Sequence, residues 1–177
     1  MRFIPMEVDG AWVIEPERLE DERGWFARAF CSAEFEAQGL ETRWVQANMS
    51  LSRSAYTLRG LHYQKPPHEE AKLVRCVRGR LWDVVADLRP GSPTFGRWAA
   101  AELTPDNLQW VYVPKGCAHG FLSLEPDSEA FYLVSCAYCP QAEAGVRWDD
   151  PLFSIRWPAE PRVMSAKDRS WPRFQGA

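Results

Sequence analysis

Hydrophobic and polar residues alternate over short stretches from about residue 42 onward, and Pro or Gly residues separate the stretches. Alternation with a period of two places one row of side chains in a core and the other in solvent, which is typical of half-buried strands. The pattern predicts strands at Lys72–Val77, Leu81–Leu88, Arg97–Leu103, Leu108–Val113, Gly120–Leu124 and Ala130–Tyr138. Short strands at this spacing, with no long helical period between them, predict an all-β antiparallel sandwich or barrel.

The two ends of the chain differ from this middle block. The segment A-E-F-E-A-Q predicts a short helix, with Ser32 as its N-cap and Gly39 as its stop. Residues 151–177 are rich in Pro and Trp, and we expect them to wrap around the barrel. Because no linker, repeat or low-complexity segment interrupts the chain, we expect one domain over residues 1–177.

The composition narrows the possible partners. Hydrophobic residues make up 46% and charged residues 25%, as in a soluble globular protein. The net charge of −3 argues against a nucleic-acid partner bound through bulk charge. The uncharged apolar runs are far shorter than the ~20 residues of a membrane span, so we expect no membrane partner.

The five cysteines indicate a reducing compartment. Their number is odd and no apolar leader follows Met1, so we expect free thiols and a cytoplasmic protein. Cys136 and Cys139 have the C-x-x-C spacing of some zinc and redox sites. The chain has no second such pair, and the surrounding pattern is that of a strand. We therefore do not expect metal or redox chemistry at this pair.

One lysine has an unusual position in the strand pattern. Lys72 shares a strand face with Val74 and Cys76, although an ammonium group is costly to bury without a partner. An exposed lysine on an edge strand is the alternative. Only four of the 21 basic residues are lysines, so lysine is not the default cation of this chain, which weighs against that alternative.

Two histidines lie in motif-like contexts. His62 lies in L-R-G-L-H-Y-Q, near a strand end, and His119 lies in V-P-K-G-C-A-H-G-F. The second segment resembles the second cupin motif, but the first motif would need H-x-H where this chain has His62-Tyr63-Gln64. A metal site would lack ligands, so we expect no metal. Taken alone, each histidine is also compatible with a structural or surface position.

Several long segments, in the same order, resemble the dTDP-4-dehydrorhamnose 3,5-epimerases, a family of cupin-fold sugar-nucleotide epimerases. The resemblance runs from about Val13 to Phe174. The segments are D-E-R-G-W-F (21–26), V-Q-A-N-M-S (45–50), L-R-G-L-H-Y-Q-K-P-P (58–67), A-K-L-V-R (71–75), D-V-V-A-D-L-R-P-G-S-P-T-F-G (83–96), V-P-K-G-C-A-H-G-F (113–121), W-D-D-P (148–151) and S-A-K-D (165–168). The resemblance implies a cupin jelly-roll, a homodimer and a cofactor-independent isomerase.

The resemblance also implies catalytic roles for four residues. His62 is the base, Asp168 orients it, Lys72 lies near the substrate oxygen and Tyr132 lies on the opposite face. In a 4-keto-6-deoxyhexose, C3 and C5 both flank the ketone, so loss of either proton gives an enolate without a redox cofactor. A neutral histidine suits the base, its aspartate stabilises the imidazolium, and a lysine offsets negative charge on the C4 oxygen.

Two of these residues have structural alternatives. Asp168 ends S-x-x-D, which is also a helix capping box that begins at Ser165. Tyr132 is compatible with a core position. Tyr138 falls on the same strand face as Tyr132, which favours a pocket.

Nucleotide-binding residues follow from the resemblance in the same way. The implied set is Arg23 and Phe26 from the neighbouring subunit, with Gln46, Asn48, Arg59, His119, Tyr138, Glu143 and Lys167. Arg59 and Lys167 suit phosphates and Tyr138 suits stacking on a base, although Arg59 is also compatible with a salt bridge at the barrel rim. The family commonly has Glu, Gln and Lys where this chain has Arg28, Glu70 and Leu133. These departures bear on thymidine specificity.

The sequence therefore predicts epimerisation of a nucleoside-diphospho-4-keto-6-deoxyhexose at C3 and C5, in deoxysugar biosynthesis of the rhamnose type. Epimerisation at C3 alone, on a non-thymidine nucleotide sugar, is one alternative. A cupin that binds sugar nucleotides without catalysis is a second, and a metal-dependent cupin oxygenase is a third.

Overall fold

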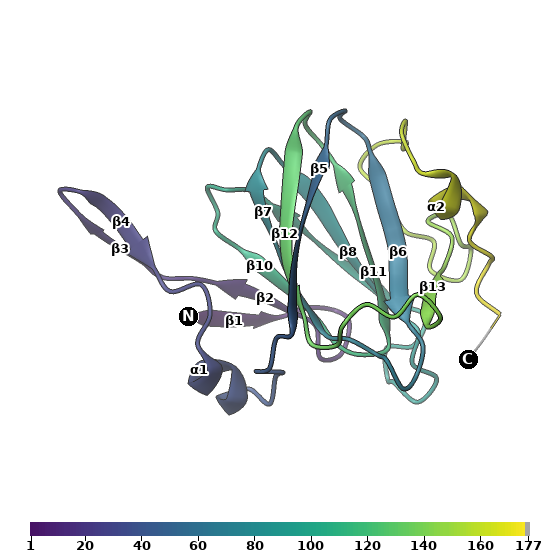
Figure 1. Cartoon of the computed structure of the whole chain (residues 1–177), viewed down its shortest axis with the longest axis horizontal. Coiled ribbons are helices and arrows are strands. Elements are labelled where there is room, and N and C mark those ends of the chain that lie inside the picture. The colour runs from purple at the N-terminus through teal and green to yellow at the C-terminus, as the bar shows by residue number, and fades with distance from the viewer. Residues whose placement is uncertain (176–177) are drawn as a thin grey trace.

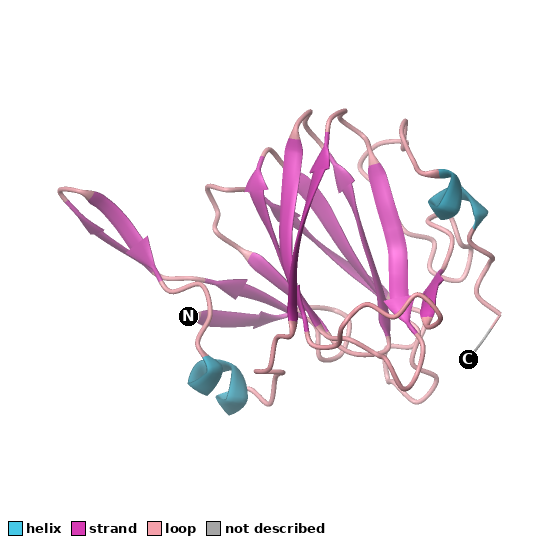
Figure 2. Ribbon diagram, viewed as in Figure 1, coloured by secondary structure: helices cyan, strands magenta, loops and turns pink. Residues whose placement is uncertain are grey.

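Two antiparallel β-sheets face each other and form the body of the molecule (Figures 1 and 2). The structure is a computed structural model that describes residues 1–175, so the predicted domain end at residue 177 lies outside it. The six-stranded sheet has the order β1 (Arg2–Pro5), β2 (Trp12–Glu15), β10 (Trp110–Val113), β7 (Lys72–Arg78), β12 (Ser128–Val134), β5 (Gln46–Ser52). The five-stranded sheet has the order β13 (Glu143–Gly145), β6 (Leu58–Gln64), β11 (Cys117–Ser123), β8 (Leu81–Asp87), β9 (Trp98–Leu103). This is the sheet-on-sheet arrangement of a jelly-roll.

Apolar side chains fill the space between the sheets at one end. Val74 and Val111 of the six-stranded sheet meet Val85 and Phe121 of the five-stranded sheet in one buried cluster. These residues alternate with outward-facing ones along their strands, so the period-two pattern builds this core directly.

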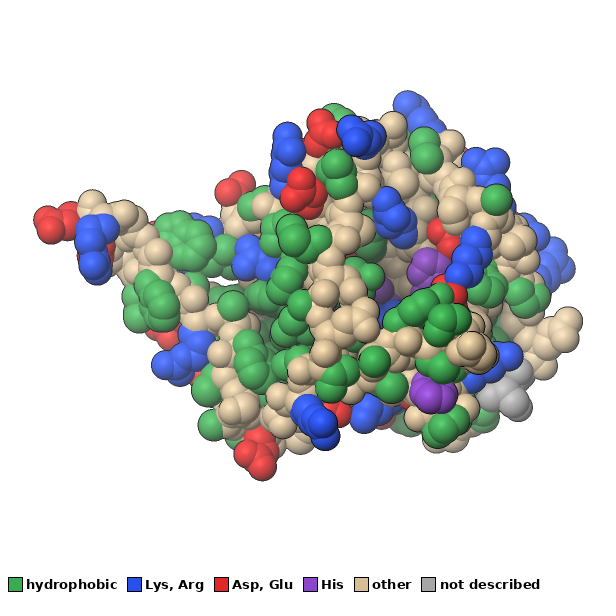
Figure 3. Space-filling model, in the orientation of Figure 1, with side chains coloured by type: hydrophobic (Ala, Val, Ile, Leu, Met, Phe, Trp, Pro, Cys, Tyr) green, Lys and Arg blue, Asp and Glu red, His purple; other side chains and the backbone are tan. Residues whose placement is uncertain are grey.

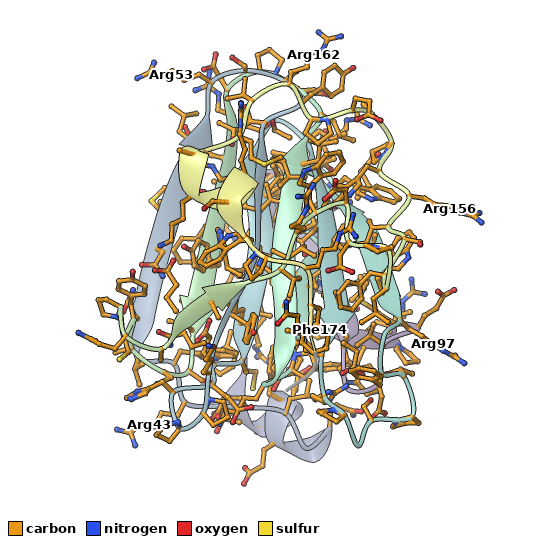
Figure 4. The ribbon with its side chains drawn as sticks, turned by 90° about the vertical axis from the view of Figure 1, so that its right-hand side faces the viewer. Arg43, Arg53, Arg97, Arg156, Arg162 and Phe174 are labelled. Atoms are coloured by element: carbon orange, nitrogen blue, oxygen red, sulfur yellow. The ribbon has the colours of Figure 1, made fainter. Side chains whose placement is uncertain are left out.

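The outer face of each sheet is also covered. The helix α1 (Ser32–Ala37) places its buried Phe35 against the six-stranded sheet. Residues after Pro151 place Phe153 and Trp157 on the five-stranded sheet, and Phe174 lies near the middle of that face (Figure 4). The prediction that the C-terminal part wraps the barrel is confirmed.

A two-stranded hairpin projects away from the barrel near the N-terminus (Figure 1). It consists of β3 (Arg18–Asp21) and β4 (Gly24–Ala27). The side chains of Leu19, Trp25 and Phe26 are 59%, 52% and 63% exposed there. Exposed apolar side chains gathered on one protruding element are typical of a surface that contacts another molecule.

Strands β6 and β11 approach each other closely at a pair of glycines. Gly60 has a φ of +123°, and a Cβ at this position would lie 2.6 Å from the Cα of Gly120. Only glycine tolerates both the backbone conformation and the contact. The same two strands carry His62 and His119, which are partners in the β6–β11 register.

Several predicted boundaries are wrong. Strand β11 begins at Cys117, three residues before the predicted Gly120, because Cys117 is already paired with Asp87 of β8. Strand β12 ends at Val134 rather than Tyr138, since the backbone N–H of Ser135 donates to Ala71 and the chain leaves the sheet. Cys136 therefore lies in a loop, not in the predicted strand, and Cys139 follows in the same loop.

The first helix is confirmed, but its predicted cap is wrong. Cys31 is the N-cap residue and makes no side-chain capping bond, while Ser32 is already the first helical residue. Gly39 follows the helix with a φ of +69°, as a helix stop requires. Within residues 1–175, no helix is long and apolar enough to cross a membrane.

Candidate active site

A cavity lies between the two sheets, beside the apolar cluster. It has two adjoining lobes. The lobes have volumes of about 310 Å³ and about 250 Å³. Both lobes are lined by four shared residues, namely His62, Lys72, Tyr132 and Glu143. Figure 3 shows the hollow, with histidine side chains inside it. The four residues come from β6, β7, β12 and β13, so both sheets contribute to one site.

His62 and Asp168 form a short hydrogen-bonding contact across 106 residues of sequence. His62 Nε2 lies 2.5 Å from Asp168 Oδ1, with the His62 side chain 35% exposed and the Asp168 side chain 7% exposed. Burial by itself would raise the pKa of Asp168, but hydrogen bonds from His62 and other donors hold it below its usual value. The carboxylate therefore stays ionised and fixes the proton of the imidazole on Nε2.

The capping alternative for Asp168 is also present in the structure. The helix α2 (Ala166–Ser170) has Ser165 as its N-cap, and Ser165 Oγ accepts the backbone N–H of Asp168 at 3.0 Å. The backbone of Asp168 serves the cap while its carboxylate contacts His62. The two interpretations of S-x-x-D hold together, because they use different atoms.

Lys72 is buried in the interior of a sheet. Its strand β7 lies between β10 and β12, so the edge-strand alternative is wrong. Lys72 Nζ lies 3.3 Å from Glu70 Oε1 and donates to the backbone oxygen of His62, also at 3.3 Å. Glu70 is thus the partner that a buried ammonium requires. Glu70 is one of the three departures from the family that bear on nucleotide specificity, and it lies beside Lys72 rather than in the nucleotide set.

Tyr132 faces the cavity from β12. Burial raises its pKa, and the nearby charge of Arg59 opposes this shift while that of Glu70 adds to it. The phenol therefore stays protonated at neutral pH and can donate a proton. Leu133, one residue later, packs on the outer face with Phe131, as strand alternation predicts.

His119 belongs to the second lobe and has a buried partner. Its Nε2 lies 2.9 Å from Oδ2 of Asp83, which is completely buried on β8. Asp83 Oδ1 has no partner among residues 1–175. The sequence analysis missed Asp83, although an acid inside the apolar run of β8 was a signal that some partner must compensate it.

Polar residues of the proposed nucleotide site line the mouth of the cavity. Tyr138 is 54% exposed, its hydroxyl donates to Glu143 at 2.6 Å, and its backbone N–H donates to Gln46 at 3.1 Å. The amide of Gln46 also donates to Asn48 at 2.8 Å, and Lys167 pairs with Glu143. Tyr138 reaches the cavity from a loop rather than from a strand.

Arg59 also lines the cavity and is held in place by two hydrogen bonds. It donates to the hydroxyl of Ser52 at 3.2 Å and to the backbone oxygen of Leu51 at 2.8 Å. These partners are neutral, so among the described residues the guanidinium makes no salt bridge of the kind that the rim alternative requires.

Two residues of the predicted nucleotide set, and Arg28, one of the departures from the family, lie elsewhere on the chain. Arg23 and Phe26 belong to the projecting hairpin, where Arg23 pairs with Asp21. Arg28 follows the hairpin and pairs with Glu34 of α1 at 3.0 Å. None of the three lines the cavity of its own chain. Arg23 and Phe26 therefore can serve such a site only in a second copy.

Cys136 lines the first lobe, while Cys139 Sγ donates to Gln141 at 3.5 Å. In the part of the chain that the structure describes, no group of three or more His, Cys, Asp or Glu side chains is placed to hold a metal ion. The chemistry that these side chains do offer is proton transfer, with a histidine on one side of the cavity and a tyrosine on the other.

Two facing antiparallel sheets with an acid–base cavity between them define a cupin-type jelly-roll protein, and comparison with known proteins narrows this class. A model of the family described as dTDP-4-dehydrorhamnose 3,5-epimerase matches residues 5–176. The chain therefore belongs to the dTDP-4-dehydrorhamnose 3,5-epimerases, a family of isomerases. The predicted family and the cupin fold are confirmed.

Individual relatives agree over nearly the whole chain. A dTDP-4-dehydrorhamnose 3,5-epimerase of Methanothermobacter thermautotrophicus is 43% identical, over 96% of this chain and 92% of that protein. The crystal structure of the enzyme of that name from Elizabethkingia anophelis NUHP1 is 40% identical, with a TM-score of 0.95 over 98% of this chain and 96% of that one. The crystal structure of a 3'-monoepimerase from Streptomyces bikiniensis, in complex with dTDP-quinovose, is 37% identical, with a TM-score of 0.87 over 96% of this chain and 86% of that one.

Proposed function

We propose that this chain epimerises a nucleoside-diphospho-4-keto-6-deoxyhexose at C3 and C5, with dTDP as the nucleotide. The observation that carries the proposal is the pair of opposed proton-transfer groups in one cavity. His62 lies on β6 and contacts Asp168 of α2, and Tyr132 lies on β12 of the facing sheet. Inversion of a carbon requires removal of a proton from one side and its return from the other, which this arrangement supports.

The proposed reaction consists of proton transfers only. His62 Nδ1 takes the proton from C3 or C5, and the electron pair of the broken C–H bond moves onto the C4 oxygen as an enolate. The ammonium of Lys72 stabilises that oxygen. Tyr132 then donates a proton to the opposite face of the carbon, the ketone re-forms, and solvent restores the two protein groups. No electron leaves the substrate, so the sequence of steps is balanced without a redox cofactor.

The same cavity accommodates the nucleotide in this proposal. Tyr138, half-exposed at the mouth, offers a ring for a base to stack on. Arg59 and Lys167 line the second lobe and supply cations for the diphosphate. His119, held by Asp83, adds a hydrogen-bonding group beside them.

Proton NMR in D₂O tests this function directly. We expect the purified protein to replace the C3 and C5 protons of dTDP-4-keto-6-deoxyglucose by deuterium, and to act at least about tenfold less efficiently on the GDP and UDP analogues. Exchange at neither carbon with any of these nucleotides would contradict catalysis and leave a binding protein.

One alternative has an observation in its favour. The relative from Streptomyces bikiniensis is a 3'-monoepimerase, although its overall structure is very similar. Deuterium at C3 alone in the same experiment would assign this chain to that narrower activity. Deuterium at both carbons would exclude it.

We also propose that the enzyme is a homodimer in which each hairpin completes the neighbouring site. The exposed apolar side chains of the hairpin support this assembly. Arg23 and Phe26 also lie in a separate two-stranded sheet and line neither lobe of the cavity of their own chain. We further propose a single domain, which the packing of both sheets on one buried cluster supports, and a location in the reducing cytoplasm, which the five free thiols support.

Complementation between two defective variants tests the shared site. Arg23→Ala removes a residue that serves the neighbour, whereas His62→Ala removes the base of its own chain. A mixed dimer of the two variants then has one intact site. We expect an equimolar, re-equilibrated mixture to recover about a quarter of the wild-type rate, because half of the dimers are mixed and half of their sites are intact.

Each variant alone is the control, and we expect each to stay well below the mixture. If Arg23 acts within its own chain, the mixture recovers nothing. A chain that elutes as a monomer in size-exclusion chromatography would also contradict the proposal.

A further inference from the structure

An indole side chain contacts both members of the His62–Asp168 pair. Trp171, the C-cap residue of α2, donates from Nε1 to Asp168 Oδ1 at 3.3 Å. This is the same carboxylate oxygen that lies 2.5 Å from His62 Nε2. The rings of Trp171 and His62 also meet edge to face, with centroids 6.0 Å apart and an interplanar angle of 71°.

The backbone around Trp171 holds this indole in place. Pro172 follows it and disfavours helical dihedral angles for the preceding residue, so the helix ends and Trp171 is extended, with φ −56° and ψ 138°. The backbone oxygen of Pro172 accepts the N–H of Arg147 at 3.3 Å, which ties this turn to the chain beyond β13.

The indole of Trp171 packs directly against a glycine on β13. A Cβ on Gly145 would lie 2.4 Å from Cε2 and 2.6 Å from Nε1 of Trp171, so the ring occupies the space that a side chain would fill. Gly145 is the register partner of His62 on β6. The β13–β6 pairing therefore fixes the position of Gly145 relative to His62. The indole fits against β13 only because position 145 has no side chain.

We propose that Trp171, seated on Gly145, is a positioning residue that aligns Asp168 and His62 for proton abstraction. This inference rests on the proposed function and adds a residue to which the sequence analysis gave no role. The indole N–H occupies a second direction on Oδ1 and stops rotation of the carboxylate. The edge of the indole limits rotation of the imidazole, so that Nδ1 stays aimed into the cavity.

The physical need for such a residue follows from soft side-chain torsions. The terminal torsions of Asp and His are broad, so a single hydrogen bond between the two groups leaves them free to turn together. A base displaced by about 1 Å can lose as much as about 10²-fold in rate. A third contact from a rigid ring removes that freedom.

A second tryptophan in the same C-terminal segment supplies a matched control. Trp157 also donates one indole hydrogen bond, to the backbone oxygen of Trp148 at 3.0 Å, and packs on the outer face of the five-stranded sheet. It does not line the cavity. Replacing either tryptophan by phenylalanine removes one N–H donor and keeps an aromatic ring.

Kinetics of the two variants test the inference. We expect Trp171→Phe to lower kcat by about tenfold, with KM and the affinity for dTDP within about twofold, because the base is misaligned but the binding groups are intact. Trp157→Phe should leave kcat unchanged. Each variant loses one hydrogen bond, so we expect Tm to fall by about 2–4 °C in both.

Gly145→Ala tests the packing of Trp171 against β13 and leaves Trp171 itself unchanged. We expect it to lower kcat by at least as much as Trp171→Phe does, again without a change in KM, since the added methyl group displaces the ring. Equal kcat values for wild type and Trp171→Phe would overturn the proposal. A loss confined to KM, or an equal loss of kcat in Trp157→Phe, would also overturn it.

A measurement without substrate separates this inference from the proposed function. In protein labelled with ¹⁵N-histidine, we expect the His62 ring, assigned with His62→Asn, to be in the Nε2–H tautomer in the wild type and in a tautomer mixture in Trp171→Phe. Identical His62 spectra would reject the positioning role. Absence of deuterium exchange in the wild type would instead reject the proposed function, and the NMR comparison would still decide the role of Trp171.

Discussion

Replacing His62 by alanine will abolish deuterium exchange at both C3 and C5 while dTDP still binds within a few-fold of its wild-type affinity. The proposed mechanism has one base for both carbons, and proton transfer by a positioned base is worth about 10²–10⁴ in rate. The base is anchored by Asp168 at 2.5 Å, and a water molecule in its place would be a far weaker base than an imidazole. Proton NMR in D₂O measures the exchange, and calorimetric titration with dTDP measures the binding.

His68→Ala is the matched control. His68 lies in the loop between β6 and β7, does not line the cavity, and takes part in the fold through its backbone oxygen, which accepts from Gln64 at 2.9 Å. We expect its exchange rates to equal those of the wild type. Exchange that persists at one carbon in His62→Ala would mean that a second base serves that carbon, and the single-base mechanism would be wrong.

Hydrophobic alternation predicts the strands that contribute to the apolar cluster, including β7 and β12, which also reach the cavity, and it misses strands whose inward residues are polar. The strand β8 was predicted to within one residue, because five of its seven residues are apolar and both of its faces pack against buried apolar clusters. In β5 the alternation is reversed. Its inward residues Gln46, Asn48 and Ser50 line the polar cavity, while Met49 on the other face is 68% exposed. A strand that serves a polar site therefore lacks the pattern by which strands are recognised.

The sequence pattern could group site residues only when they lie on the same strand. Alternation placed Lys72 on the face of Val74, and both lie inward in the structure. Partners on other elements could not be found in this way. Asp83 contacts His119 across 36 residues, and Trp171 meets His62 only because α2 packs on β6. Such pairings depend on tertiary structure, which local periodicity does not encode.

The two interpretations of S-x-x-D lead to the second large effect. Asp168→Asn will lower kcat by about 10²–10⁴-fold, because a neutral amide cannot stabilise the imidazolium that forms when His62 takes a proton. Hydrogen bonds to the carboxylate hold the pKa of Asp168 below its usual value despite burial, so the wild-type group is charged throughout the neutral range. The amide removes this charge and keeps nearly the same shape. Initial rates of exchange at saturating substrate measure the effect.

Ser165→Ala separates the cap from the catalytic contact. Ser165 Oγ accepts the backbone N–H of Asp168, so Asp168→Asn leaves the cap intact, whereas Ser165→Ala removes the cap and keeps the His62–Asp168 contact. Loss of such a cap costs about 1 kcal/mol, or about 2–4 °C in Tm for a chain of this size. We expect Ser165→Ala to lower Tm with kcat within about threefold of the wild type, since a frayed helix end still carries the carboxylate.

The pH dependence of stability gives an independent check on the charge of Asp168. A carboxyl group whose pKa is lower in the folded state stabilises the fold above its unfolded pKa, and this contribution is lost as the pH falls toward the folded pKa. The Tm difference between wild type and Asp168→Asn should therefore be largest near neutral pH and narrow below about pH 4. If Asp168→Asn keeps the wild-type kcat and changes Tm alone, the carboxylate serves the helix and not the histidine, and the acid–base assignment of the whole cavity would have to be rebuilt around another base.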